Sequence, residues 1–207
     1  MIGYLYYFQM IKHSNILLVV LILIISKNIY AYSSASLLIS QTAFNNYDFK
    51  QVLYEYRKET NDEYKENYFN ELISAVIIED IILAGKIANK ILLNDPNNQE
   101  AKLVSIVKAF IYKLPKRIRT LRFNENKKRN DLIEFLFFQD SGFKNNNDIS
   151  NSFLEIVKSS YANYGTDYFT NYNLLLFYTS LSILINQQNY EATFVKAQLL
   201  QIINNYF

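Results

Sequence analysis

Apolar residues recur along most of the chain at spacings of three and four, which is the period of an α-helix rather than of a half-buried strand. One apolar stripe covers residues 35–43 and a second covers residues 49–56, with only the polar segment 45–48 between them. Two helices joined by so short a connection must lie antiparallel. The pattern therefore predicts a helix hairpin at the start of this region.

The same period returns through the rest of the chain. Asp95 and Pro96 mark a helix stop followed by a turn, and Pro115 interrupts the helix before it. Residues 145–148 are predicted to form a loop, and residues 152–155 (Ser-Phe-Leu-Glu) have the form of a capping box at the start of a helix that stops at Gly165. Further helices are predicted at residues 72–76, 81–92, 103–111, 132–137, 153–164, 174–185 and 190–200.

The N-terminal segment has the three-part plan of a secretory signal peptide. Ten apolar residues from Ile16 to Ile25 follow Lys12, and a short polar stretch then ends at Ala31. Ten apolar residues are about half of the roughly 20 that span a bilayer core. We therefore predict that residues 1–31 are a signal peptide, with a retained membrane anchor as the alternative. The protein is expected to be exported to the periplasm or cell envelope, or anchored in the inner membrane.

Composition narrows the chemistry. The 207 residues are half hydrophobic, with 4 glycines and 2 prolines, which suits one helical domain over residues 32–207. The chain has no cysteine, and its one histidine, His13, lies in the leader, which excludes disulfides, histidine or thiolate metal sites and a Ser-His-Asp triad from the remainder. We expect no cofactor and no metal.

Charge argues against nucleic acid as a partner. The chain has 21 basic and 19 acidic residues, and residues 1–31 contain Lys12 and Lys27 but no acid, so residues 32–207 carry 19 of each. Nucleic-acid binding depends on many basic contacts that release counterions, and a neutral chain offers no long-range attraction.

A basic segment at residues 113–129 is the exception to this balance. Eight lysines and arginines accompany the single acid Glu125, within the stretch 114–131 that we predict to be irregular. Such a segment is either a solvated linker or a contact surface for anionic lipid or an acidic partner.

Hairpins that recur at intervals in the low thirties indicate a repeat architecture. Residues 46–56 resemble the turn and second helix of a tetratricopeptide repeat (TPR), although Tyr47 and Glu79 stand where the family usually has glycine. The leader followed at once by such units resembles exported TPR proteins of alphaproteobacteria. The resemblance assigns repeat packing to Phe49, Tyr56, Ala75, Ala84, Ala88 and Pro96.

The resemblance implies an α-solenoid of antiparallel helix hairpins whose first helices line a concave groove. An almost wholly apolar lining would suit an apolar peptide or an amphipathic helix. The alternative is that later helices of the same chain fill the groove. The groove positions carried over from the family are Leu37, Gln41, Phe44, Phe69, Ile73, Ile77, Leu103, Val107 and Phe110.

These features favour an exported, non-enzymatic scaffold that binds a protein or peptide. One alternative is a carboxylate-dependent α/α hydrolase acting on cell-envelope glycan, which needs two acids about 5 to 10 Å apart across a cleft. Another is a membrane-tethered assembly factor that retains residues 1–31. We expect acids such as Glu55 and the pair Glu79 and Asp80 to be surface residues or helix caps rather than catalytic groups.

Overall fold

The computed structural model describes residues 35–58, 68–121, 131–139, 142–164 and 171–206, and within them the fold is all-α, as predicted. The predicted leader lies outside these residues. Among the helices that the structure describes, none combines the length and apolar character needed to cross a membrane. A first helix is described over residues 35–45 and is followed by α2 (Phe49–Lys58), α3 (Phe69–Ile77), α4 (Ile81–Asn94), α5 (Gln99–Ile111), α6 (Pro115–Leu121), α7 (Asp131–Phe137), α8 (Asn146–Tyr164), α9 (Tyr172–Ile185) and α10 (Tyr190–Tyr206).

Three helix ends repeat one turn geometry. Tyr47, Glu79 and Lys113 each follow a helix with a positive φ, of 59°, 65° and 55°. In each case the next residue's N–H reaches back over the last turn to a carbonyl, which is the Schellman arrangement that closes a helix end. These bonds run from Asp48 to Ala43 (2.8 Å), from Asp80 to Ala75 (2.9 Å) and from Leu114 to Ala109 (2.7 Å).

These turns divide residues 35–121 into helix pairs of one design. Two of the three left-handed positions, Tyr47 and Glu79, are those at which the repeat resemblance expects glycine. Glycine adopts a positive φ without the steric cost that other residues carry there. The backbone is therefore left-handed at both positions even though neither residue is glycine.

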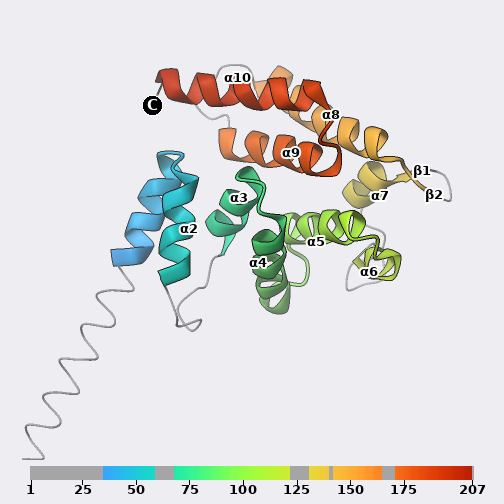
Figure 1. Ribbon diagram of the computed structural model, residues 1–207, viewed down its shortest axis with the longest axis horizontal. Coiled ribbons are helices and arrows are strands. Elements are labelled where there is room, and N and C mark those ends of the chain that lie inside the picture. Colours follow the sequence, from blue (N-terminus) through green and yellow to red (C-terminus); the bar gives the residue numbers. More distant parts are fainter. Residues whose placement is uncertain (1–34, 59–67, 122–130, 140–141, 165–170, 207) are drawn as a thin grey trace, which may run out of the picture.

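The helices are arranged in stacked layers (Figure 1). In this chain α3 packs between α2 and α4, α4 packs on α5, and α5 packs on α6. Helix α9 then lies across α3 and α5, and α8 and α10 pack on α9 from the other side. The pKa of Tyr178 on α9 is raised by burial and, to a smaller extent, by the carboxylate of Glu100 on α5, which also reflects this contact.

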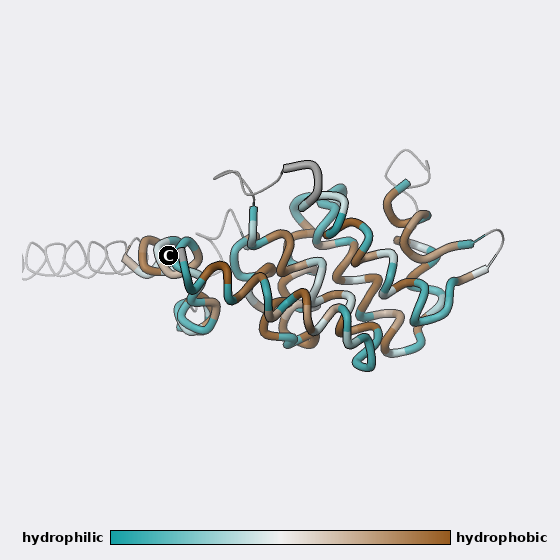
Figure 2. Tube along the Cα trace, turned by 90° about the horizontal axis from the view of Figure 1, so that it is seen from above, coloured by the Kyte–Doolittle hydropathy of each residue, from teal (hydrophilic) through white to brown (hydrophobic). Residues whose placement is uncertain are grey.

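Helix α9 is deeply embedded in the stack. Leu176, Phe177 and Leu181 are fully buried, and its serines and threonine are buried as well. A helix that is apolar on all sides belongs inside a protein, because no face of it is suited to water. The outer helices alternate brown and teal along their length in Figure 2, as expected for elements with one apolar and one polar face.

A short β-hairpin joins α7 to α8. Strand β1 (Phe138–Gln139) pairs antiparallel with β2 (Gly142–Phe143). Phe138 stands opposite Phe143, and their ring centroids are 4.8 Å apart. The sequence pattern gives no sign of these strands, since two-residue strands are too short to show alternation.

The prediction that residues 114–131 are irregular is wrong at residues 115–121, which form α6. Pro115 is the first residue of this helix, where a missing N–H costs nothing because the first turn has no intrahelical acceptor. Ile118 is the one buried residue of α6 and anchors it to the core. With a single apolar anchor among basic residues, the helix leaves no clear stripe in the sequence.

Helix α8 also begins earlier than predicted. The helix begins at Asn146, inside the predicted loop 145–148, and Asn145 accepts a hydrogen bond from the N–H of Asp148 at 2.9 Å. Ser152 therefore lies within the helix, where its hydroxyl donates to the carbonyl of Asp148 at 2.8 Å instead of capping the helix. Gly165, the predicted stop, lies outside the described residues.

Lys196 connects the last helix to the first half of the chain. Its ammonium donates to the carbonyl of Ile77 at 2.7 Å and to the carboxylate of Glu79 at 2.6 Å. The Lys196 side chain is only 14% exposed. A cation at the end of α3 satisfies a carbonyl that has no partner within the helix and lies at the negative end of the helix dipole.

We predict that Lys196→Met lowers the free energy of unfolding by about 1 to 2 kcal/mol, because it removes a charged hydrogen bond and an ion pair from a largely buried position. The control is Lys158→Met, which breaks the exposed pair between Lys158 and Glu191 and is expected to cost less than about 0.5 kcal/mol. Urea denaturation followed by circular dichroism measures both. Equal losses would show that the Lys196 contacts do not stabilise the fold.

Candidate functional site

The groove predicted along the first helices is filled by the chain itself. Ile73 and Val107 are fully buried, and Ile77 and Leu103 are 4% and 1% exposed. Helix α9 covers this face by packing on both α3 and α5. These four residues are therefore core residues and not an open binding surface, as in the alternative in which later helices occupy the groove.

The remaining predicted groove residues lie in different surroundings. Leu37 and Gln41 are exposed on the first helix, and Phe44 is buried against Phe49 with a ring-centroid distance of 6.3 Å. Phe69 and Phe110 are half-buried. The nine positions thus do not form one continuous surface.

The residues predicted to pack the repeats differ in burial. Phe49 is 6% exposed, and the three alanines at positions 75, 84 and 88 are fully buried. Tyr56 is half-buried with its ring edge-on to Tyr68, and Pro96 is exposed in the turn between α4 and α5. Small side chains at these helix contacts let the backbones approach closely.

An open cleft of about 720 Å³ lies where the ends of α5 and α9 meet the starts of α6 and α8. Phe110 is the predicted groove residue that lines it. Its other lining residues are Ile111, Lys113, Leu114, Pro115, Ile118, Phe143, Lys144, Asn146, Leu184, Ile185, Asn186 and Gln187.

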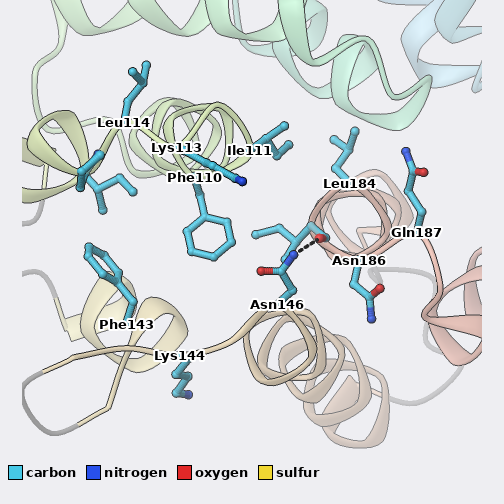
Figure 3. Close-up of a pocket in the computed structure, with 13 residues that line it drawn as sticks. Phe110, Ile111, Lys113, Leu114, Phe143, Lys144, Asn146, Leu184, Asn186 and Gln187 are labelled. Carbon is cyan, nitrogen blue, oxygen red and sulfur yellow. Dashed lines mark hydrogen bonds between the residues drawn. The ribbon is translucent and has the colours of Figure 1, made fainter.

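Aromatic and amide side chains face one another across this cleft (Figure 3). Phe110 points from α5 toward Asn146 at the start of α8, and Phe143 approaches from the β-hairpin. Asn146 donates through its side-chain nitrogen to the carbonyl of Ile185 at 3.4 Å. The cleft therefore has an apolar interior with amide groups along the α8 and α9 side.

Lys144 holds the β-hairpin that forms one wall. Its backbone N–H donates to the carbonyl of Phe137 at 2.9 Å, and its ammonium donates to the carbonyl of Phe135 at 2.7 Å and to Ser152 at 2.9 Å. In Figure 3 this ammonium points away from the cleft. Lys113, by contrast, lies on the α5 side of the opening.

The lining defines what the cleft can do. Among the described residues, this lining contains no carboxylate, hydroxyl or imidazole group that could act in acid–base chemistry. Apolar pockets with a few polar groups are typical binding sites. The cleft is suited to an apolar segment whose polar atoms can bond the amides of Asn146, Asn186 and Gln187.

Two acids are buried elsewhere, which corrects the expectation that Glu55 is a surface residue. Glu55 is 3% exposed and accepts hydrogen bonds from Ser36 at 2.9 Å, from Gln51 at 2.8 Å and from Lys58 at 3.0 Å. Glu71 is 6% exposed and accepts from Ser40. Neither lines the cleft. Asp80 caps α4 by accepting from the N–H of Leu83, as expected.

The described residues also offer no metal-binding cluster. Within them, no three side chains of His, Cys, Asp or Glu gather closely enough to hold an ion.

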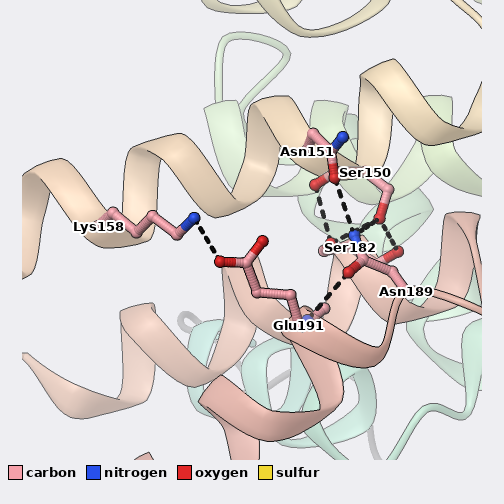
Figure 4. A network of polar contacts seen from close by, with 7 residues as sticks. Ser150, Asn151, Lys158, Ser182, Asn189 and Glu191 are labelled. Carbon is pink, nitrogen blue, oxygen red and sulfur yellow. Dashed lines mark hydrogen bonds and ion pairs between the residues drawn. The ribbon is translucent and has the colours of Figure 1, made fainter.

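A buried polar network joins α8, α9 and α10 (Figure 4). Ser150 on α8 and Ser182 on α9 bond reciprocally, each hydroxyl reaching the other residue's carbonyl at 2.9 and 2.8 Å. Asn189 donates to Ser150 at 2.8 Å and to Asn151 at 3.1 Å, and caps α10 by accepting from the N–H of Ala192 at 3.0 Å. The network therefore fixes α8, α9 and α10 relative to one another.

Sequence reasoning missed most of the cleft residues. Phe143 and Leu184 come from segments far apart in the chain, so no local spacing relates them. The one sequence signal nearby is the polar run after α9, residues 186–189, which indicates a turn but not a partner for α5.

Comparison of the chain with family models, with curated proteins and with solved structures finds no match.

We predict that Asn189→Ala lowers the free energy of unfolding by about 2 to 3 kcal/mol, since it removes a helix cap and two hydrogen bonds to α8. The matched control is Asn171→Ala, because Asn171 caps α9 through the N–H of Leu174 at an exposed position and contributes no such cross-helix bonds. The control should cost about 1 kcal/mol. Similar losses in urea denaturation would mean that the bonds to Ser150 and Asn151 add nothing.

Proposed function

We propose that residues 32–207 form an exported, non-enzymatic TPR-like scaffold that binds an apolar segment of a partner protein in the cleft between α5 and α9. The observation that carries this proposal is the cleft itself, about 720 Å³ in volume and lined by Phe110, Phe143 and Leu184 together with side-chain amides. Binding is favourable when a partner removes these apolar walls from water. Hydrogen bonds to the side-chain amides of the cleft would orient such a partner.

The assignment to TPR-like repeats rests on local geometry. The three left-handed turns at positions 47, 79 and 113 recur at the expected interval, and the alanines predicted to pack between helices are buried. In this interpretation the helix pairs from residue 35 to residue 121 are successive units of a short α-solenoid. The helices α8, α9 and α10 then cover its inner face.

In this proposal the binding surface is not the groove along the first helices that the resemblance implies. Because α9 occupies the inner face, the free apolar surface is at the end of the array, where α5 turns into α6. A partner would approach this end rather than lie along the first helices. Export and the cleavage of residues 1–31 remain predictions from the leader sequence.

Site-specific photocrosslinking tests the binding role. We expect that benzoylphenylalanine in place of Phe143, which is 38% exposed at the cleft, gives a discrete adduct with one partner protein in cells that produce the chain. The adduct should disappear when Gln187, an exposed residue at the mouth of the cleft, is replaced by Trp to fill the opening.

The control places benzoylphenylalanine at Tyr190, an aromatic residue that is 83% exposed and lies outside the cleft. We expect no adduct from this position. Equal labelling from both positions, or an adduct that survives Gln187→Trp, would contradict binding in the cleft. Turnover of a substrate by the purified chain would contradict the non-enzymatic role.

A further inference from the structure

The corner formed by the end of α5 and by α6 exposes basic and apolar side chains together. Residues 108–121 include five lysines and arginines and no acid. On the short helix α6 only Ile118 is buried, which leaves Lys116 and Arg119 exposed. We call the exposed set Ile111, Tyr112, Lys113, Leu114, Lys116 and Arg119 the basic corner.

The cations of the basic corner are not neutralised by the fold. Among the described residues, no carboxylate forms an ion pair with Lys113, Lys116 or Arg119. Arg117 next to them donates to the neutral amide of Asn89. A concentration of unpaired positive charge of this kind attracts an anionic surface.

The apolar residues of the corner are equally exposed. Tyr112 and Leu114 expose 48% and 50% of their surface, and Ile111 exposes 36%. A merely solvated basic face has no need of exposed Leu and Ile side chains. Apolar and aromatic side chains flanked by Lys and Arg are typical of surfaces that enter the boundary between lipid headgroups and acyl chains.

Comparison with the two equivalent turns shows that the geometry does not require an apolar residue here. Asp48 and Asp80 occupy the position of Leu114 and cap the helices that follow, by accepting from the N–H of Gln51 at 3.1 Å and of Leu83 at 2.9 Å. Leucine at the third turn gives up this cap, which ordinarily stabilises a helix. The chain thus has an exposed leucine at the one turn where basic residues surround it.

From this combination we propose that the basic corner docks on an anionic phospholipid bilayer, with Tyr112 and Leu114 at the headgroup boundary and Lys113, Lys116 and Arg119 against the phosphates. Each basic side chain near an anionic bilayer strengthens binding about fivefold. The apolar residues add an attraction that does not depend on salt. The corner overlaps the edge of the cleft: Ile111, Lys113 and Leu114 also line the cleft, whereas Tyr112, Lys116 and Arg119 do not.

A single fluorescent label can report the docking in the full-length chain, because the chain has no cysteine. An environment-sensitive nitrobenzoxadiazole label is attached to the Tyr112→Cys variant. We expect its emission to shift to the blue on vesicles of equal parts phosphatidylcholine and phosphatidylglycerol, and to stay unchanged on pure phosphatidylcholine. The same label on Leu93→Cys, an 83% exposed site at the other end of the α4–α5 hairpin, should not shift on either.

Charge variants separate local contact from overall charge. Lys116→Gln with Arg119→Gln should raise the half-maximal vesicle concentration about 25-fold, at about fivefold for each charge. Lys50→Gln with Lys158→Gln removes the same charge from exposed positions on α2 and α8 and should leave the titration unchanged. Equal effects of the two pairs would overturn the proposal.

Leu114→Asp distinguishes docking from folding. The new carboxylate restores the cap found at Asp48 and Asp80, so the variant should be at least as stable as the parent in urea denaturation. Its vesicle binding should nevertheless fall at least tenfold, because an apolar contact becomes a repelled charge. A blue shift on neutral vesicles would overturn the proposal, because docking would then not require anionic lipid. The absence of a shift on anionic vesicles would also overturn it, and would leave an acidic protein surface as the partner of the corner.

Discussion

The packing of α9 across α3 and α5 is the interaction on which the rest of this structure depends. Leu176, Phe177 and Leu181 are fully buried in it, and complete burial of such a side chain contributes roughly 1.5 to 3 kcal/mol. The same packing buries the predicted groove residues of α3 and α5, among them Ile73 and Val107. It also brings the ends of α5 and α9 together, and the open cleft is the space left where these two ends meet α6 and α8.

Polar contacts decide how this apolar stack is aligned. Hydrophobic attraction has no preferred direction, and an apolar helix such as α9 could slide or rotate at little cost. The reciprocal bonds of Ser150 and Ser182 and the three bonds of Asn189 hold α8, α9 and α10 in one register. Lys196 then joins α10 to the end of α3. Buried hydrogen-bonding groups must find their partners, and only one alignment provides them.

The three Schellman turns show how a backbone pattern can persist while the side chains around it change. Tyr47, Glu79 and Lys113 share one conformation, yet the residue after the first two is a capping aspartate and after the third it is Leu114. The change places exposed apolar and basic groups at the edge of the cleft. The cleft and the basic corner therefore both lie where α5 turns into α6.

The sequence by itself determined the helices, the turns and many buried positions, including the three alanines at 75, 84 and 88, because apolar period and turn chemistry depend on residues close together in the chain. It missed α6, whose single anchor Ile118 leaves no stripe, and it placed Glu55 on the surface because Ser36, which bonds the carboxylate, lies on another helix. Only the tertiary structure decided that α9 fills the predicted groove and that Phe110 and Leu184 share a cleft. Those outcomes depend on which apolar faces meet, and an apolar face on one helix can be buried by many others, so spacing along the chain does not select the partner.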